Sequence, residues 1–160
     1  MSVENLTVQK LRERFGEAIL DVRTFREETT VILRREDAFA ANQFLRDDPE
    51  LRYNYLVDLC GVDNMGAEPR LMVVYHLYSY QRNERIRIKA GVPEEDCTIA
   101  SMIPLWKGAD WLEREAYDMF GIRFEGHPNL CRILNTDDFD GYPLRKDFPV
   151  RGKRTLEEET

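Results

Sequence analysis

The sequence predicts an α+β fold, a two-layer sandwich in which helices lie on one side of a β-sheet. Two observations lead to this prediction. The chain has 160 residues, of which 42% are hydrophobic, and a chain of this size buries enough surface to form one core without disulfides or metals. Its predicted elements follow the order helix, two strands, helix and three strands, which favours helices gathered on one face of a sheet. An additional helix and an extended C-terminal arm complete the chain.

A helix and a β-hairpin are predicted at the N-terminus. Apolar side chains recur at helical spacing up to Phe15, with Thr7 in position to cap the helix and Gly16 where it would end. β-branched and aromatic residues then dominate 19–25 and 30–33. The polar stretch between these two runs is typical of a hairpin connection.

A second helix and three further strands follow. Residues 35–46 carry apolar side chains on one helical face, and Pro49 bounds the segment. The runs 53–60, 71–80 and 85–92 have the composition of strands. The last run alternates apolar with mostly charged residues, so we expect that strand to have one face in water.

A further helix is predicted over 111–120. Asp110 and Glu113 have the spacing of a capping box, in which each side chain bonds to the backbone of the other residue. Arg114 and Asp118 lie four residues apart, so we expect them to form an ion pair along the helix. This helix closes the α+β domain, which we place at 1–125.

Residues 126–160 are predicted to form an extended arm, because glycine and proline interrupt them every few positions. The arm also carries aromatic side chains that a solvated tail would not need. Two arrangements fit equally: the arm lies across a partner protein, or it folds back over the chain's own sheet. Its basic side chains would meet an acidic surface in the first case, and they are Arg145, Lys146, Arg151, Lys153 and Arg154.

The charge balance excludes several classes of protein. Asp and Glu number 30 against 23 Lys and Arg, giving a formal charge of −7, and nucleic-acid binding needs a concentrated basic face. No apolar run approaches the roughly 20 residues of a membrane-spanning helix. The N-terminal segment is charged and unlike a signal peptide. We therefore expect a cytoplasmic protein that binds no nucleic acid.

The metal-ligating residue types are too few and too dispersed for a metal or cluster site. The three cysteines, Cys60, Cys97 and Cys131, form no Cys-x-x-Cys pair, and the only histidines are His76 and His127. This pattern favours reduced thiols over a disulfide framework, a zinc site or an iron–sulfur cluster. The glycines are also too scattered for a phosphate or dinucleotide loop.

Two further patterns suggest chemistry but are better explained by structure. Glu113, Glu115 and His127 contain the groups of a general acid–base site, as in a stand-alone hydrolase. Side chains two positions apart on a helix point in different directions, however, so the two carboxylates are not expected to share a substrate. The segment 136–147 has the acidic residues of a calcium loop without its usual terminal Glu, and we interpret it as a turn.

The run EREAYDMFGIRFEGHPNLCRIL at 113–134, followed by GYPLRKDFP at 141–149, resembles the signature of one family of respiratory complex I proteins. This family comprises the C subunit, also called the 30 kDa subunit, of proton-pumping NADH-quinone oxidoreductase. The resemblance continues more loosely upstream through 55–63, 73–79 and 107–111. It implies an α-β-β-α-β-β-β fold with a mixed sheet, which agrees with the order of elements above.

The resemblance also implies a role. Members of the family are non-catalytic subunits of the peripheral arm, and they bind no cofactor while FMN and iron–sulfur clusters sit in other subunits. The implied partners are the quinone-site B and D subunits, at the cytoplasmic face of the inner membrane. The alternative is the equivalent subunit of a membrane-bound hydrogenase or an F420H2-type dehydrogenase.

By the same resemblance, ten residues stand at signature positions. We assign them to structure and subunit docking, with no catalytic, cofactor-binding or metal-binding role. Where relatives usually carry a basic residue, this chain has Cys131, so a contact made there by relatives is in doubt. The ten residues are Glu113, Arg114, Glu115, Asp118, His127, Pro128, Arg132, Arg145, Lys146 and Asp147.

Overall fold

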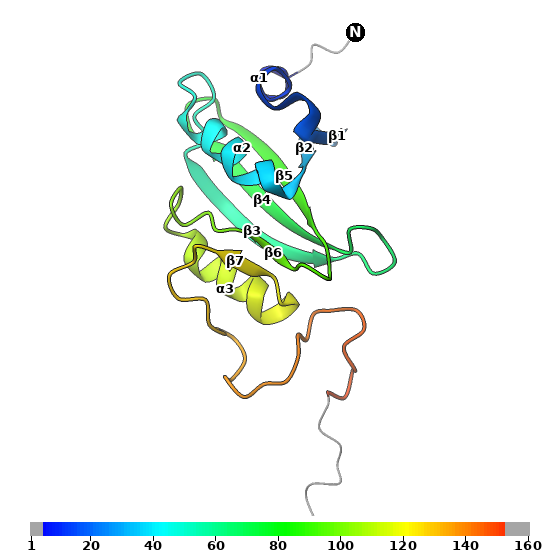
Figure 1. The fold of residues 1–160 in the computed structure, drawn as a ribbon. Coiled ribbons are helices and arrows are strands. Elements are labelled where there is room, and N and C mark those ends of the chain that lie inside the picture. Colours follow the sequence, from blue (N-terminus) through cyan, green and yellow to red (C-terminus); the bar gives the residue numbers. More distant parts are fainter. Residues whose placement is uncertain (1–4, 153–160) are drawn as a thin grey trace, which may run out of the picture.

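A computed structural model describes residues 5–152 and shows a mixed five-stranded sheet in the order β1-β2-β5-β4-β3 (Figure 1). Strands β2 and β5 pair in parallel and the other neighbours are antiparallel. The predicted α+β class and the mixed sheet are confirmed. The strands of this sheet are β1 Ile19–Phe25, β2 Glu28–Leu33, β3 Tyr55–Asp63, β4 Leu71–Ser79 and β5 Glu84–Val92.

Helices α1 (Leu6–Phe15) and α2 (Arg35–Asp47) lie over one face of this sheet (Figure 1). A short 3-10 turn, Gly16–Ala18, joins α1 to β1. The helices and the sheet enclose a core in which side chains such as Leu45 and Ile88 have no exposed surface. Strand β5 alternates buried and partly exposed residues, as its sequence predicted.

The cap of α1 differs from the prediction. Asn5, and not Thr7, caps the helix, because the Asn5 side chain accepts a hydrogen bond from the Thr7 backbone N–H at 2.8 Å. Thr7 is fully buried, and its hydroxyl lies 3.0 Å from the Tyr53 hydroxyl. Both Asn and Thr are residue types that commonly cap helices, so the sequence alone does not choose between Asn5 and Thr7. The Thr7 hydroxyl bonds to Tyr53, and Asn5 is the cap.

The predicted hairpin is confirmed, with a tighter turn than expected. Arg26 and Glu27 have φ values of 50° and 67°, the left-handed conformations of a two-residue turn whose twist suits a hairpin. Strand β2 therefore begins at Glu28, two residues before the predicted start.

Helix α3 (Ala109–Phe120) packs against the edge strand β3, and a second, two-stranded parallel sheet flanks it. The strands of that small sheet, β6 (Thr98–Ala100) and β7 (Arg123–Glu125), were not predicted. The close approach of α3 requires a glycine on β3, because a Cβ at Gly61 would lie 2.5 Å from the Phe120 ring.

The predicted capping box at the start of α3 is wrong. The helix begins at Ala109 after Gly108, and no side chain caps it. Glu113 instead points into the protein and is fully buried. A capping box needs the Glu113 side chain to reach back to the Asp110 backbone, whereas here both of its oxygens bind Ser101 and Met102 in the loop before the helix.

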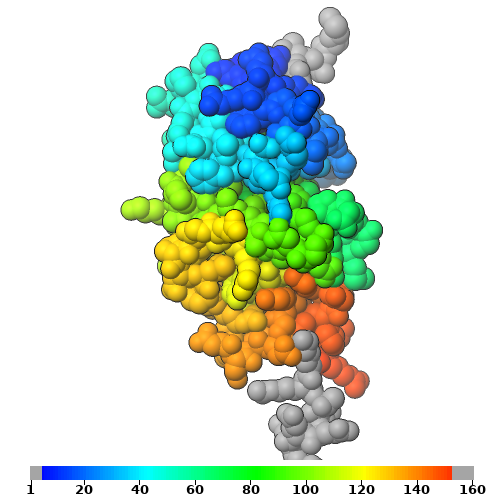
Figure 2. Space-filling model, in the orientation of Figure 1, coloured from blue at the N-terminus to red at the C-terminus, as the bar shows by residue number. Residues whose placement is uncertain are grey.

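Residues 126–152 contain turns and bends without a helix or strand. They run below α3 and lie against it, at the opposite end of the molecule from α1 (Figures 1 and 2). No helix within residues 5–152 is long and apolar enough to cross a membrane. Residues 153–160, with the predicted basic Lys153 and Arg154, lie outside the described part of the chain.

Candidate functional site

The first of two polar clusters at the arm centres on Asp118 of α3, whose side chain has no exposed surface. The backbone N–H groups of Ile133, Leu134 and Asn135 donate to its Oδ2 at 3.1, 2.8 and 2.8 Å. Oδ1 accepts from Arg132 Nη1 at 2.7 Å and from the Asn135 side-chain amide at 3.0 Å. One carboxylate therefore holds four consecutive residues of the chain.

These donors also decide the charge state of Asp118. Burial on its own would raise the pKa of this carboxyl, but the backbone N–H groups, the Arg132 guanidinium and the Asn135 amide outweigh it. The pKa of Asp118 consequently lies well below its ordinary value, and the group is a carboxylate at neutral pH.

The predicted ion pair between Arg114 and Asp118 is absent. Arg114 instead donates to the carbonyl oxygens of Cys131 at 3.2 Å and Arg132 at 2.9 Å. An exposed pair at this spacing contributes only about 0.2–0.5 kcal/mol, less than the partly buried hydrogen bonds that both side chains make with the arm. The hydrogen bond between Cys131 and α3 is therefore made by the carbonyl group of Cys131.

Arg132 extends the cluster to the next part of the arm. Its Nη2 donates to the carbonyl oxygens of Phe139 at 3.0 Å and Gly141 at 3.1 Å. The guanidinium also lies over the Tyr142 ring, 5.4 Å from its centroid. Since Arg132 also pairs with Asp118, it joins the helix to a loop seven to nine residues further along the chain.

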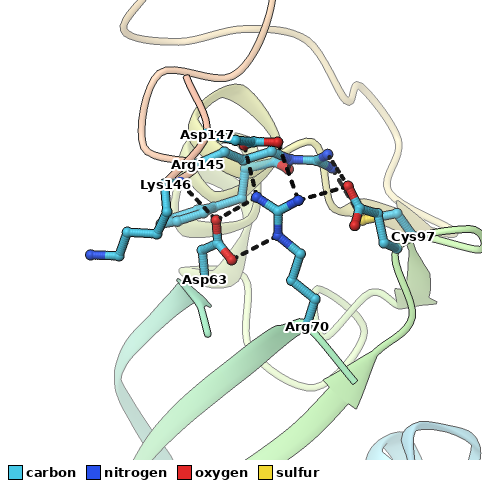
Figure 3. Close-up of polar contacts among 8 residues, drawn as sticks. Asp63, Arg70, Cys97, Arg145, Lys146 and Asp147 are labelled. Carbon is cyan, nitrogen blue, oxygen red and sulfur yellow. Dashed lines mark hydrogen bonds and ion pairs between the residues drawn. The ribbon is translucent and has the colours of Figure 1, made fainter. Parts of the chain in front are cut away.

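The second cluster surrounds Arg70, at the start of β4 (Figure 3). Arg70 donates two hydrogen bonds to Asp63, at 2.9 and 2.8 Å, and two to Asp147, at 2.7 and 3.3 Å. Glu94 accepts a further bond at 2.8 Å. The bonds from Arg70, helped by the Lys146 backbone N–H at 2.7 Å, lower the pKa of the buried Asp63 to about 2.

Arg145 lies beside this cluster and closes the C-terminal end of α3. Its Nε donates to the Phe120 carbonyl oxygen at 2.7 Å, one of the acceptors that the end of a helix leaves unpaired. The guanidinium lies 5.1 Å from the centroid of the Tyr142 ring. Lys146, by contrast, directs its exposed side chain away from the cluster (Figure 3).

Glu113 fixes the loop that precedes α3. Its Oε2 accepts from the Ser101 hydroxyl at 2.7 Å and its Oε1 accepts from the Met102 backbone N–H at 2.5 Å. Burial raises the pKa of Glu113 to about 6, against the opposing effect of these two donors. Both carboxylate oxygens are therefore committed to the protein itself.

The remaining signature residues on this side of α3 do not join Glu113 in one site. His127 Nδ1 accepts from the Asn129 backbone N–H at 3.0 Å, which places the proton on Nε2, 3.2 Å from the Asp110 carbonyl oxygen. Glu115 is exposed while Glu113 is buried, in agreement with their spacing, and Pro128 is exposed in the turn after β7. Within residues 5–152, no group of three or more potential ligands is placed to hold a metal ion.

Two arrangements of the arm were predicted, across a partner or back over the chain itself. In the structure, residues 126–152 fold back onto the chain. The arm contacts α3 through Asp118 and Phe120, and it contacts Asp63 at the end of β3 and Arg70 at the start of β4. Sequence reasoning missed Asp63, Arg70 and Glu94 as anchors. Only Asp63 had a signal, as the last residue of the upstream stretch that resembles the family.

These observations define a two-layer α+β domain whose C-terminal arm packs against its own helix α3. Several of the signature residues lie where α3 and the arm meet. The family described as "Respiratory-chain NADH dehydrogenase, 30 Kd subunit" matches residues 31–154. The chain therefore belongs to this family, and the predicted resemblance is confirmed.

Individual relatives agree with this assignment. The C subunit of NADH-quinone oxidoreductase from Citrifermentans bemidjiense is 54% identical over 152 residues, 95% of this chain and 93% of that protein. The corresponding protein of Geobacter sulfurreducens is 50% identical over 153 residues, with the same coverage of this chain and of that protein.

Solved structures show the same fold. "Nqo5 of the trypsin-resistant fragment (1-134)" superimposes with a TM-score of 0.64 at 30% identity, covering 78% of this chain and 100% of that one. A chain of the membrane-bound sulfane sulfur reductase, an archaeal respiratory membrane complex, gives a TM-score of 0.73 at 21% identity, covering 89% of this chain and 84% of that one. The second likeness concerns the fold alone.

Proposed function

We propose that the chain is a non-catalytic subunit in the peripheral arm of a proton-translocating NADH-quinone oxidoreductase. It holds the quinone-reducing module in place while electrons pass from NADH through FMN and iron–sulfur clusters of other subunits to quinone. The chain itself binds none of these cofactors. Family membership, and relatives named as the C subunit of NADH-quinone oxidoreductase, support this proposal.

One observation carries the scaffolding role: three charged residues of the signature, Asp118, Arg132 and Arg145, are engaged in holding the chain's own arm. Asp118 and Arg132 fix the start of the arm, and Arg145 fixes its later part to the end of α3. A group committed to several internal hydrogen bonds is poorly suited to exchanging protons with a substrate. The arrangement suits a rigid surface made jointly by α3 and the arm.

The proposed partners are the quinone-site B and D subunits, at the cytoplasmic face of the inner membrane. Contact with the membrane would be made only through the complex. The exposed Lys146 is a suitable probe of docking by the arm, because its side chain makes no hydrogen bond or ion pair within the described part of the chain. Arg145 is not, because its substitution also removes the contact with Phe120.

The test is recovery of the tagged, full-length chain from gently solubilised membranes, with identification of the co-eluting subunits and an NADH-to-quinone assay. Co-elution of the quinone-site and NADH-oxidising subunits, with activity, is the expected result. Nickel-hydrogenase subunits or F420H2-oxidising subunits in the eluate would assign the chain to the alternative complex. A chain that elutes alone would contradict the scaffolding role.

A further inference from the structure

An exposed apolar surface lies on the outer side of the junction between α3 and the arm. Trp111, on the first turn of α3, exposes 70% of its surface, and Leu134 exposes 65%. Ile133, next to Leu134, exposes 37%. A large aromatic side chain left in water is unfavourable in an isolated domain, and such residues are enriched at the centres of protein interfaces.

The internal contacts of the signature bring these residues to one side of the molecule. Trp111, Glu115 and Asp118 follow one another at helical spacing and so lie along one face of α3. Asp118 binds the backbone of 133–135 against that face, and Arg114 does the same for 131–132. Trp111 near the start of α3, and Ile133 and Leu134 beside Asp118 about two turns further on, therefore lie along the same side of the helix.

This surface is held rigid before any partner arrives. The backbone of Ile133 and Leu134 donates to a carboxylate with no exposed surface, and Trp111 stands on a regular helix. Ordering side chains and loops on binding opposes association, so a pre-ordered anchor binds more tightly than a loose one. The contacts that seat the arm thus also prepare the apolar surface.

The chain around the apolar surface is acidic. Between positions 107 and 140 the exposed basic side chains are Lys107, four positions before Trp111, and Arg123, against five exposed carboxylates. A partner that covers this surface would meet negative charge around an apolar centre. The exposed acidic side chains of the same stretch are Glu115, Glu125, Asp137, Asp138 and Asp140.

Charge distinguishes between the occupants of such a surface. A second copy of the chain would bring like charges together, and an anionic membrane would repel the same carboxylates. We propose that Trp111, with Ile133 and Leu134, is the anchor by which this chain docks into an apolar pocket on a positively charged protein surface. This inference rests on the proposed function, and the surface belongs to one of the quinone-site subunits.

The experiment uses the full-length chain and a purified complex of the B and D subunits from the same organism. Trp111→Ala should raise the Kd at least about 30-fold, as for a central aromatic anchor. Glu115→Lys should weaken binding at low salt and flatten its dependence on ionic strength. The matched control is Tyr80→Ala, which removes an aromatic ring with 64% exposure beyond the end of β4.

The outcomes separate the two proposals. In the first outcome, the wild type binds and the Kd of Trp111→Ala lies within about threefold of the wild-type Kd, which is a change typical of residues outside a hot spot. This result would overturn the docking anchor and leave the scaffolding function intact. No wild-type binding to the complex of B and D subunits would overturn both. Dimerisation or binding to anionic vesicles that is lost in Trp111→Ala would also overturn the anchor, because it would identify a different occupant.

Discussion

Asp118→Asn is the substitution that most directly tests how the arm is seated. The amide keeps the shape of the carboxylate, and one oxygen still accepts from the backbone N–H groups of residues 133–135. Its NH2 group then faces Arg132 and the side-chain amide of Asn135, both of which are donors. The variant therefore loses one charge pair and places donors against donors.

The size of the effect follows from burial. The Asp118 side chain has no exposure and that of Arg132 has 13%, and removing one partner of a buried pair costs roughly 3–5 kcal/mol. Because Arg132 retains some contact with water, we expect about 3 kcal/mol. If the arm opens independently of the domain, its open fraction should rise by about 100-fold, since about 1.4 kcal/mol corresponds to a factor of ten.

Two assays measure this opening. Hydrogen exchange at the amides of residues 133–135 should accelerate by about 100-fold, and trypsin should cut more rapidly after Arg132 and Arg145. Glu115→Gln is the control, because it neutralises an exposed carboxylate on the same helix. Exchange and cleavage in Asp118→Asn within about threefold of the wild type would refute the assigned role, as would an equal change in the control.

Four further outcomes follow from single contacts. The Glu113 pKa of about 6 lies above the ordinary value of 4.5, so burial favours the protonated form. As pH rises from about 4 through 6, the free energy of unfolding of the wild type should therefore fall by about 2 kcal/mol relative to that of Glu113→Gln, as measured by urea unfolding. The Asp63 pKa of about 2 lies below its ordinary value of 3.8. The free energy of unfolding should therefore fall by about 2.4 kcal/mol as pH is lowered from about 4 to 2, and Asp63→Asn should not show this fall. Gly61→Ala should destabilise by about 1–3 kcal/mol through its clash with Phe120, and Phe120→Leu should recover part of this in a double-mutant cycle. Arg145→Glu should lower the free energy of unfolding by about 1–3 kcal/mol while Lys146→Glu changes it by less than about 0.5, and equal effects would contradict the arm geometry.

The sheet and its two covering helices could be predicted because their signal is local and repeated. Alternation along β5 and the helical spacing in α1 and α2 report burial on one face, and that burial is what the fold requires. Strands β6 and β7 have three residues each, too few to show a period. Their pairing depends on α3, which separates them in the sequence.

Local rules failed where a distant partner competed for the same side chain. Glu113 fits a capping box by spacing, yet it binds Ser101 and Met102 in the loop before the helix. Arg114 fits an ion pair by spacing, yet it binds carbonyl groups of the arm. A spacing rule counts only neighbours within a turn, whereas buried contacts made by folding contribute more.

The Arg70 cluster shows a different limit of the sequence. Arg70 meets Asp63, Glu94 and Asp147, which lie 7, 24 and 77 positions away, and no periodicity relates residues at such separations. Their meeting requires the completed sheet, which places the start of β4 next to the end of β3 and of β5. A charged residue in such a place is predictable only once the topology is known.

The structure also changes how a charged signature should be interpreted. Charged residues close together in sequence suggest either catalysis or docking. Here burial separates the charged signature residues that hold the fold from those that face solvent. Asp118 and Glu113 are buried and have internal partners, so substitutions there act first on folding. Glu115 and Lys146 are exposed, so we expect substitutions there to leave the fold unchanged and to test association separately from folding. A loss of assembly in a buried variant therefore cannot by itself demonstrate docking, whereas the same loss in Glu115→Lys, with unchanged unfolding, can.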